Sequence, residues 1–435
     1  MTAAVILCII SPKTFVTSLF YGVSAVYIIW GVYHVIITGA GLKPPLNPSI
    51  SLKEYPKISA IIPARNEPIL GRTIEICVEH ILYPKEKKEV IVVTDDPEGE
   101  RIALWYQLKY PSIVKVLARK QFYPTKPSAL NDALALCTGE IVAILDVEDI
   151  PDRDVFLKAA SAIMNHGCQA VQVILRISNE NDSLLTKLFA VEFAAWFRIW
   201  LNGRARLKLY APLGGTGNYF TIKALKNVGG WDSTNLAEDA EVAIRLLIAS
   251  WNIEVLDARH SEEAPVSFEP WLRQRTRWFR GWLQSLWKYL LALFSPAAIK
   301  RLGFVRIFTV LLMLLNPLIV IMNWVAYALT IYWVMEASRL LPFGIMTEAG
   351  PVWIYIPATL NALYYYVWFK GAQLEGISLD RRYALHIIYY LNIMMPLAAL
   401  RAFYQEIFKP VFWEKTKHIG RGVRWVGTEK IEYEH

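Results

Sequence analysis

The chain has 435 residues, which exceeds one average domain, and apolar residues make up 54% of it. The net charge of +8 could indicate a nucleic-acid partner, but basic residues concentrate beside apolar segments, at 273–280 and 415–424. That placement is typical of contact with anionic lipid headgroups and argues against nucleic acid. The cysteines lie far apart, which excludes a disulfide framework and a convincing zinc site and favours reduced thiols facing a cytosol: Cys8, Cys77, Cys137 and Cys168.

The N-terminal part predicts a membrane anchor. Residues 15–40 are nearly all apolar and long enough to cross a bilayer, and no clear small-residue cleavage site follows them. We therefore assign residues 1–43 to a retained transmembrane anchor. The proline-rich segment 42–49 cannot be helical. We expect it to lead into a catalytic domain over residues 44–264.

Predicted strands alternate with predicted helices in the first half of that domain. The strands are expected at 58–62, 90–93, 113–117 and 141–145, and the helices at 69–80, 100–108 and 127–136. This alternation predicts an α/β fold with a parallel, doubly wound sheet. Neither G-x-G-x-x-G nor G-x-x-x-x-G-K-[ST] occurs here. Their absence argues against a Rossmann dehydrogenase and a P-loop ATPase.

Polar clusters follow three of these strands, at 65–67, 95–96 and 146–149. Because the carboxyl ends of parallel strands meet at one edge of a sheet, we expect the clusters to lie together and to bind a ligand there. Asp146 and Glu148 follow a buried strand at positions i and i+2. Hard oxygen ligands of this kind suit Mg²⁺ or Mn²⁺, with phosphate oxygens completing the shell. The sequence therefore predicts a metal–diphosphate site.

Three later segments each allow two interpretations. Residues 184–201 are either an amphipathic helix on the membrane surface or an ordinary core helix. The glycine-rich loop at 214–219 either lets backbone approach a ligand closely or is a plain hairpin turn. Glu238 and Asp239 open a predicted helix ending near 249, where carboxylates are common because they complement the helix dipole.

Residues 265–294 combine tryptophan with arginine at helical spacing. This pattern describes either a helix at the lipid headgroup boundary or a wall that stacks sugars and holds phosphate. We assign 265–300 to interface helices, 301–404 to transmembrane helices with candidate spans at 304–334, 352–369 and 383–400, and 405–435 to a basic cytosolic tail. Three full crossings would put that tail outside, so we expect 383–400 to be re-entrant or interfacial.

Four separated motifs together resemble the membrane-bound family 2 glycosyltransferases, which include cellulose and hyaluronan synthases. They are Asp95-Asp96, Asp146-Val-Glu148, Glu238-Asp239 and Gln274-Arg-Thr-Arg-Trp278, which correspond to the D, D-x-D, E-D and Q-x-x-R-W motifs. Lys126-Pro-Ser-Ala-Leu-Asn131 resembles a further family segment. The likeness covers roughly 56–290. It implies a GT-A (Rossmann-like) nucleotide-sugar domain combined with α-helical transmembrane and interface helices.

The resemblance also implies roles for individual residues. Asp146 and Glu148 would hold Mg²⁺ or Mn²⁺, with Glu148 standing where the family usually has a second Asp. Asp239 would be the general base. The remaining positions are assigned to the two substrates, as follows. The donor would contact Pro63, Glu67, Asp95, Asp96, Lys126, Asp146, Gln274, Arg275 and Arg277. The acceptor would contact Trp278, Glu238, Gly215, Thr216 and Gly217. Trp271 and Trp287 lie outside the motif and are expected to anchor the protein at the bilayer.

These assignments predict an inverting glycosyltransferase in the cell (plasma) membrane, multi-pass, with a cytosolic catalytic domain. Its donor would be a GDP- or UDP-linked hexose, with mannose favoured over glucose or N-acetylglucosamine. The small membrane part leaves little room for a polymer tunnel, which favours a single addition to a lipid-linked glycan, of the polyprenyl-phosphate type. The alternatives are a processive polysaccharide synthase and a non-catalytic membrane nucleotide sensor. Residues 413–417 resemble a segment that closes over the nucleotide in larger relatives.

Overall fold

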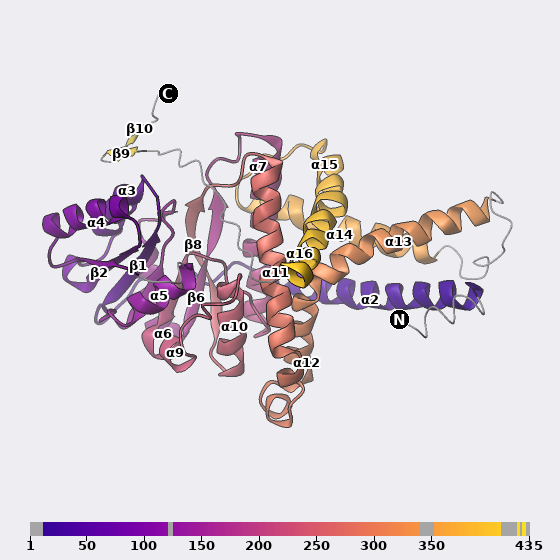
Figure 1. Cartoon of the computed structure of the whole chain (residues 1–435), viewed down its shortest axis with the longest axis horizontal. Helices are drawn as coiled ribbons and strands as arrows, with labels where there is room; N and C mark the ends of the chain where they lie inside the picture. Colours follow the sequence, from indigo (N-terminus) through magenta and orange to yellow (C-terminus); the bar gives the residue numbers. More distant parts are fainter. Residues whose placement is uncertain (1–11, 121–124, 339–351, 410–423, 427–428, 432–435) are drawn as a thin grey trace.

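The computed structural model describes residues 12–120, 125–338, 352–409, 424–426 and 429–431. Its central feature is an eight-stranded sheet with the strand order β3-β2-β1-β4-β7-β6-β8-β5. Helices cover the sheet, and a helical region extends from one end of it (Figure 1). The predicted closing segment at 413–417 and most of the predicted basic tail lie outside the described residues.

The first half of the sheet confirms the predicted parallel strands. β1 pairs in parallel with β2 and β4, and β2 pairs in parallel with β3. The strands are β1 (Ile58–Ala64), β2 (Lys88–Thr94), β3 (Val114–Ala118) and β4 (Ile141–Ile144). β2 and β4 are buried along their whole length, because both faces of the sheet are covered by helices.

The second half of the sheet is mixed, so the parallel arrangement predicted from the strands at 58–145 does not extend to the whole sheet. β7 (Asn218–Thr221) runs antiparallel to β4 and to β6 (Ala170–Ile177). β6 pairs in parallel with β8 (Ile253–Glu262), and the short β5 (Ile150–Pro151) is antiparallel to β8. After β6 the chain leaves the sheet through the helical region and returns as β7. Because this connection does not carry the chain back to the end of the sheet where β6 begins, β7 runs antiparallel to β6.

Two helices beside the sheet begin at residues whose side chains cap the first turn. Asp96 caps α4 by accepting from the Gly99 amide at 2.8 Å, and Thr125 caps α5, which starts just before Pro127. The helices of this domain are α3 (Leu70–Glu75), η1 (Ile76–His80), η2 (Lys85–Lys87), α4 (Pro97–Lys109), α5 (Lys126–Leu134), α6 (Val155–His166), α9 (Ile222–Asn227) and α10 (Glu238–Ile248). Cys77, Cys137 and Cys168 are buried free thiols.

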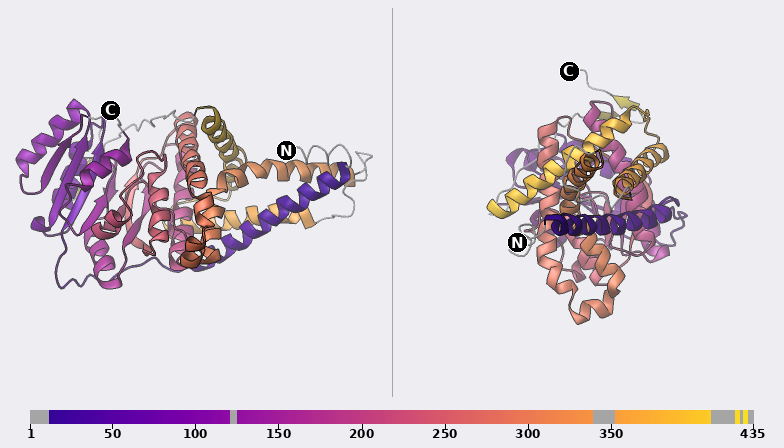
Figure 2. Two further views of the ribbon diagram at one scale, coloured as in Figure 1. Left: turned by 60° about the horizontal axis from the view of Figure 1, so that its bottom comes forward. Right: turned by 90° about the vertical axis from the view of Figure 1, so that its right-hand side faces the viewer.

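Three long helices extend together away from the sheet (Figures 1 and 2). They are α2 (Pro12–Gly41), α13 (Asn316–Ala337) and α14 (Val352–Leu374). Side chains join them: the Tyr27 hydroxyl donates to Asn323 at 2.6 Å, and the Trp30 indole donates to Tyr364 at 2.8 Å. We call this group the three-helix bundle.

Further helices lie between the bundle and the sheet (Figure 1). They are α7 (Leu184–Phe193), η3 (Ala194–Leu201), α8 (Asn202–Arg206), α11 (Phe268–Leu293), α12 (Pro296–Leu314), α15 (Tyr383–Tyr389), η4 (Tyr390–Met394) and α16 (Met395–Phe408). Most of the side chains of α7 and η3 are buried, so residues 184–201 follow the core-helix interpretation. β9 (Arg424–Val426) and β10 (Glu429–Ile431) form a separate antiparallel pair.

Among the described residues, Thr14–Gly41 and Tyr383–Phe408 are helices long and apolar enough to cross a membrane. The predicted span at 304–334 is not one straight helix. α12 and α13 pass the same test only together and meet at a bend of 64°, next to Pro317. Whether 383–400 crosses the bilayer or lies at its surface stays a prediction.

α2 and α8 cross with their main chains in contact. A side-chain carbon on Gly41 would overlap the carbonyl oxygen of Ile199, and one on Gly203 would overlap that of Ile37. Only glycine at both positions permits this approach. Asn202 fixes the same crossing by donating to the Gly41 carbonyl at 3.1 Å.

Candidate active site

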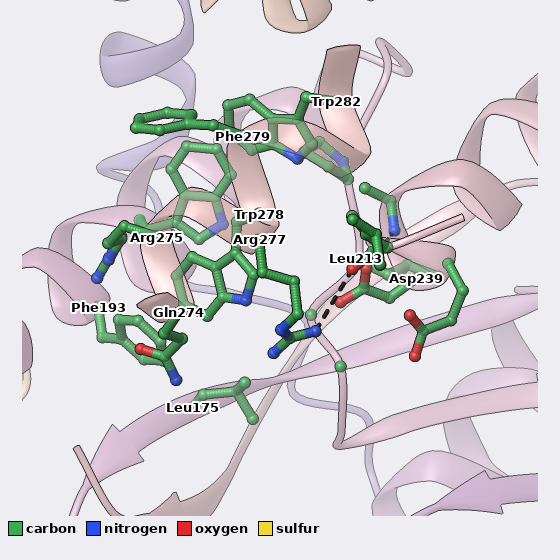
Figure 3. Close-up of a pocket in the computed structure, with 18 of the residues that line it drawn as sticks. Leu175, Phe193, Leu213, Asp239, Gln274, Arg275, Arg277, Trp278, Phe279 and Trp282 are labelled. Atoms are coloured by element: carbon green, nitrogen blue, oxygen red, sulfur yellow. Dashed lines mark hydrogen bonds between the residues drawn. The ribbon is translucent and has the colours of Figure 1, made fainter. Parts of the chain in front are cut away.

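A single cavity of about 460 Å³ connects the carboxyl ends of the central strands with the three-helix bundle. Its lining includes Asp146 after β4, Asp239 on α10 and Trp278 on α11, which belong to three different elements of the chain. Figure 3 shows the part of the cavity where α11 faces Asp239. The structure therefore brings the three acidic motifs and the Q-x-x-R-W helix to one space.

The far end of the cavity is lined by the loops after β1 and β2. Pro63, Glu67 and Asp95 all border it. The Asp95 carboxylate lies 3.4 Å from the Arg65 guanidinium. Asp96 is not part of the lining, because its carboxylate caps α4 and also accepts from the Asn66 amide at 2.9 Å. Of this adjacent pair, Asp95 is the residue that faces the cavity.

Lys126 neutralises the acidic edge after β4. Its ammonium lies 2.5 Å from Asp146 Oδ1 and donates to the Gly215 carbonyl at 2.8 Å. Burial alone would lower the pKa of Lys126, but Asp146 and Glu238 outweigh burial and raise it, so the side chain stays charged.

Asp149 and Thr216 stabilise the loop after β4 by hydrogen-bonding the main chain of Asp146. The buried Asp149 carboxylate accepts from the Asp146 amide at 2.9 Å and from the Thr216 hydroxyl, and lies 3.3 Å from His260 Nδ1. Thr216 is 1% exposed and also accepts from the Asp146 amide at 3.1 Å. Thr216 thus orients the loop that carries Asp146, and its hydroxyl does not face the cavity. Gly217, also buried, has a positive φ of 67° and continues into β7.

The chemistry of the donor set at this edge fits a hard divalent cation. Asp146 and Glu148 both line the cavity and are only partly buried. Within the described residues no group of three or more His, Cys, Asp or Glu forms a closed metal site. Two carboxylates can hold Mg²⁺ or Mn²⁺ when substrate phosphates supply the remaining oxygens.

Glu238 and Asp239 open α10 and face the cavity. Burial, and then the charge of Asp239, raise the pKa of Glu238 to about 7. Burial likewise raises the pKa of Asp239, although its own contact with the Ala240 amide at 2.7 Å and the charges of Lys126 and Arg277 work against this. Burial therefore outweighs the helix N-terminus, which by itself favours the ionised form of Asp239. A carboxylate with a raised pKa is the stronger proton acceptor.

Gly215 lies beside both Asp239, the candidate general base, and the ammonium group of Lys126. A side-chain carbon on Gly215 would come within 3.5 Å of Asp239 Oδ2 and 3.6 Å of Lys126 Nζ. On the other side, Gly281 of α11 touches the backbone of Ala237, so that any larger residue would push α11 away from the start of α10. These contacts place Asp239 in the space between α11 and the acidic edge.

α11 presents Gln274, Arg277 and Trp278 to the cavity (Figure 3). Gln274 is buried, and its Oε1 has no hydrogen-bond partner, which leaves an acceptor available for a ligand. Arg277 extends toward the start of α10 and donates to the Leu236 carbonyl at 3.4 Å. Trp278 packs over the Arg275 guanidinium, whose carbon lies 4.4 Å from the ring centre.

Arg275 is already paired. It makes two hydrogen bonds to Glu192 of α7, at 2.6 and 2.7 Å, and lies between the rings of Trp278 and Phe189. Glu192 also accepts from Tyr390 at 2.6 Å. A diphosphate could reach Arg275 only by opening this bidentate pair. In the described structure, then, Arg275 joins α11 to α7 and η4.

Trp271 belongs to the same network, and its prediction as a bilayer anchor was wrong. It has no exposed surface, and its indole donates to Tyr390 at 2.8 Å. Trp287, 61% exposed, is free to meet lipid. The two tryptophans differ because Trp271 packs against Tyr390 of η4, a contact that sequence spacing alone does not reveal.

Breaking the Arg275–Glu192 pair should destabilise the fold. Arg275→Ala leaves a largely buried carboxylate without its cation, for which we expect a loss of about 3 kcal/mol. Arg273→Ala is the matched control on the same helix, because its pair with Glu269 is exposed and worth less than about 1 kcal/mol. Thermal unfolding in detergent should show a much lower midpoint for Arg275→Ala alone. Equal midpoints would contradict this role.

In this sheet, the acidic edge and the helix α11, which carries arginine and tryptophan, border one cavity. This arrangement defines a glycosyltransferase of the GT-A fold. The chain belongs to the glycosyl transferase family group 2, whose family model matches residues 141–397, more than half of it. Probable glycosyltransferase YdaM of Bacillus subtilis is 31% identical over 251 residues, 56% of this chain and 60% of that protein. Beta-monoglucosyldiacylglycerol synthase of Synechocystis is 27% identical over 295 residues, 63% and 60% of the two chains.

The chain thus spans about 60% of the length of these curated relatives. Among solved structures, it is similar to the mannosyltransferase PcManGT from Pyrobaculum calidifontis, in complex with GDP-Man and Mn²⁺. The TM-score is 0.57 at 19% identity, over 91% of this chain and 98% of that one. At this identity the likeness concerns the fold, and it agrees with the predicted fold class.

Sequence reasoning missed several residues of the site. Glu192 lies within the predicted helical segment 184–201 and belongs to none of the motifs, yet it is the partner of Arg275. Glu262 and Glu263, at the end of β8, line the cavity. A polar pair ending a strand was the signal used for β1, β2 and β4, and it would have found them had β8 been predicted.

Proposed function

We propose that this protein is an inverting, metal-dependent hexosyltransferase that moves one sugar from a nucleotide diphosphate to a lipid acceptor held in the membrane. The observation that carries the proposal is the single cavity. One end is lined by acidic side chains and Lys126, the other by aromatic side chains of the three-helix bundle, and Asp239 lies between them. A polar donor and an apolar acceptor can therefore meet at one carboxylate.

In the reaction, Asp239 accepts the proton of an acceptor hydroxyl while that oxygen bonds to the anomeric carbon of the sugar. The bond from this carbon to the diphosphate oxygen breaks, and the nucleoside diphosphate leaves. One displacement inverts the anomeric centre and requires no carboxylate nucleophile. Gln274 and Arg277 are placed to hydrogen-bond the diphosphate, and Trp278 to stack on the acceptor.

Asp146 and Glu148 would hold Mg²⁺ or Mn²⁺, which supplies the positive charge that offsets the leaving diphosphate. Lys126 contributes a second positive charge beside Asp146. Glu67 and Asp95 border the end of the cavity where the nucleoside would lie. Mannose is the favoured sugar, supported by the GDP-Man in the similar fold, with glucose or N-acetylglucosamine next.

The membrane arrangement is also proposed. The anchor at 1–43, the catalytic domain at 44–264, the interface helices at 265–300 and the membrane helices at 301–404 would place the active site on the cytosolic face of the cell membrane. The apolar character of Thr14–Gly41 supports this, as does the glycolipid synthase among the relatives. The bundle of α2, α13 and α14 is small, which favours single addition over processive synthesis.

A donor screen tests the proposal. Hydrolysis and transfer are measured for GDP-mannose, UDP-glucose and UDP-N-acetylglucosamine, with membrane lipid extract as acceptor and with Mn²⁺ or EDTA. We expect one donor to be consumed, only with metal, to give a product carrying one added sugar. A ladder of long products would favour a processive synthase instead, and binding without turnover would favour a sensor.

The raised pKa values predict an unusual pH dependence. A base must lose its proton to act, so activity should fall as the pH drops through the pKa of Glu238, which is raised to about 7, and through the pKa of Asp239, which is raised above its ordinary value. Ordinary carboxylates titrate at about 4. In Glu238→Gln the acidic limb should move to lower pH, because one of the two carboxyls no longer titrates. The pH profile of kcat/KM checks this, and a wild-type limb near pH 4 would contradict it.

A further inference from the structure

The cavity does not end at the catalytic residues. It continues past α11 between the helices of the three-helix bundle, where its lining is aromatic and amide-bearing: Tyr27, Trp30, His34, Asn323 and Tyr364. Arg204 of α8 lies on the wall at this end. The proposed function assigns this end of the cavity to the acceptor, but it gives none of these side chains an individual role.

Arg204 carries a buried charge without a counter-charge. Four arginines are buried in the described part of the chain, and three of them pair with a glutamate: Arg198 with Glu375, Arg275 with Glu192 and Arg280 with Glu406. Within the described residues, Arg204 forms no ion pair. Its side chain has no exposed surface, so water does not replace the missing anion.

The hydrogen bonding of Arg204 is also incomplete. Its Nε donates to the Tyr33 hydroxyl at 2.8 Å, and its Nη2 lies 3.1 Å from the Met313 sulfur, a weak acceptor. Its Nη1 is buried and has no hydrogen-bond partner. The guanidinium carbon lies 4.8 Å from the ring centre of Trp196 and 5.7 Å from that of Tyr33. Aromatic faces reduce the cost of burying the cation without neutralising it.

Arg204 and Asp239 line the same cavity. An acceptor whose anionic group meets Arg204 would therefore lie in the cavity that also holds Asp239. Tyr210 lies outside that lining and supports the catalytic end, because its hydroxyl donates to the carbonyl of Ala240, next to Asp239, at 2.9 Å.

We propose that Arg204 binds the phosphate of a phosphorylated isoprenoid lipid, so that the acceptor of this enzyme is an anionic lipid-linked sugar and not a neutral glycosyldiacylglycerol. A guanidinium with a free N–H matches phosphate oxygens, and the aromatic walls of the bundle match an isoprenoid tail. Because the Arg204 side chain has no exposed surface, the ligand has to displace neighbouring side chains to reach Nη1. This inference rests on the proposed function, because it names the acceptor of that same reaction.

The test measures binding of farnesyl phosphate, farnesol and inorganic phosphate to the full chain in detergent. Wild type should bind farnesyl phosphate at least about 30-fold more tightly than farnesol, the range expected for a charged hydrogen bond, and inorganic phosphate should not compete at equal concentration. Arg204→Gln should lose this preference and Arg204→Lys should keep part of it. Arg206→Gln, an exposed arginine two residues along, should keep it fully.

Several outcomes would overturn the inference. Equal binding of farnesyl phosphate and farnesol by wild type would do so, and so would an unchanged preference in Arg204→Gln. Equal competition by phosphatidic acid would assign the site to bilayer phospholipid. A raised donor KM in Arg204→Gln would assign the phosphate to the nucleotide. Donor-nucleotide binding by Arg204→Gln verifies that it folds, and failure of wild type to consume any nucleotide sugar would reject the proposed function separately.

Discussion

Asp239→Asn is expected to bind the nucleotide sugar normally and to lose sugar transfer by about 10³-fold or more. The substitution keeps the shape of the side chain but removes its ability to accept a proton, and positioned general bases contribute about 10² to 10⁴ in rate. The geometry supports this residue because Asp239 lies beside Lys126 and Gly215 and faces α11 across the cavity. Steady-state transfer and donor titration measure the two properties separately.

Asp154→Asn is the matched control for that experiment. Asp154 lies on the surface at the start of α6, where it pairs with Lys158, and does not line the cavity. It should transfer sugar at the wild-type rate. Activity in Asp239→Asn equal to that of the control would reject Asp239 as the base, whereas loss of donor binding as well would show that the carboxylate mainly shapes the donor site.

Asp146→Asn is expected to show the second large effect. Removing one of the two carboxylates should weaken Mn²⁺ binding and lower sugar transfer by at least about 100-fold at limiting metal. The reason is that the cation contributes several kcal/mol to stabilising the negative charge that develops on the leaving diphosphate. Glu148→Gln should do the same. EDTA should abolish wild-type activity, and added Mn²⁺ should restore it.

Electron paramagnetic resonance of Mn²⁺, with and without nucleoside diphosphate, checks this independently of turnover. Wild type should bind the ion more tightly when the diphosphate is present, since phosphate oxygens complete the shell. Glu98→Gln, exposed at the start of α4, is the control and should match wild type. Activity that survives EDTA in wild type would contradict a metal-dependent reaction.

The acidic edge could be predicted because its signal is local. A continuous apolar strand that stops at polar residues fixes both the strand and its end, as in Ile141–Ile144 followed by Asp146. Parallel strands then bring such ends together, and the cavity indeed joins Glu67, Asp95 and Asp146. The antiparallel β7 escaped this reasoning, because four residues after a glycine loop carry no direction of their own.

The sequence could not predict which residues of a motif face the cavity and which have a structural role, because these roles depend on partners far away in the chain. Asp95 and Asp96 are neighbours of the same type, and only the start of α4 decides that Asp96 becomes a cap. Arg275 reads as a phosphate ligand until Glu192, 83 positions away, is seen beside it. Arg204 gave no signal at all in the sequence, since its importance lies in a buried Nη1 that has no hydrogen-bond partner among the described residues.

The glycine crossing of α2 and α8 has a consequence for the whole enzyme. Because the two main chains touch at Gly41 and Gly203, no side chain separates α2 from α8 at this crossing. If α2 crosses the bilayer, the height of the catalytic edge above the lipid is then set by main-chain geometry. The active site would then lie at a fixed distance from the membrane surface. Acceptor hydroxyls at that distance would be reached, and hydroxyls held further out by longer headgroups would not.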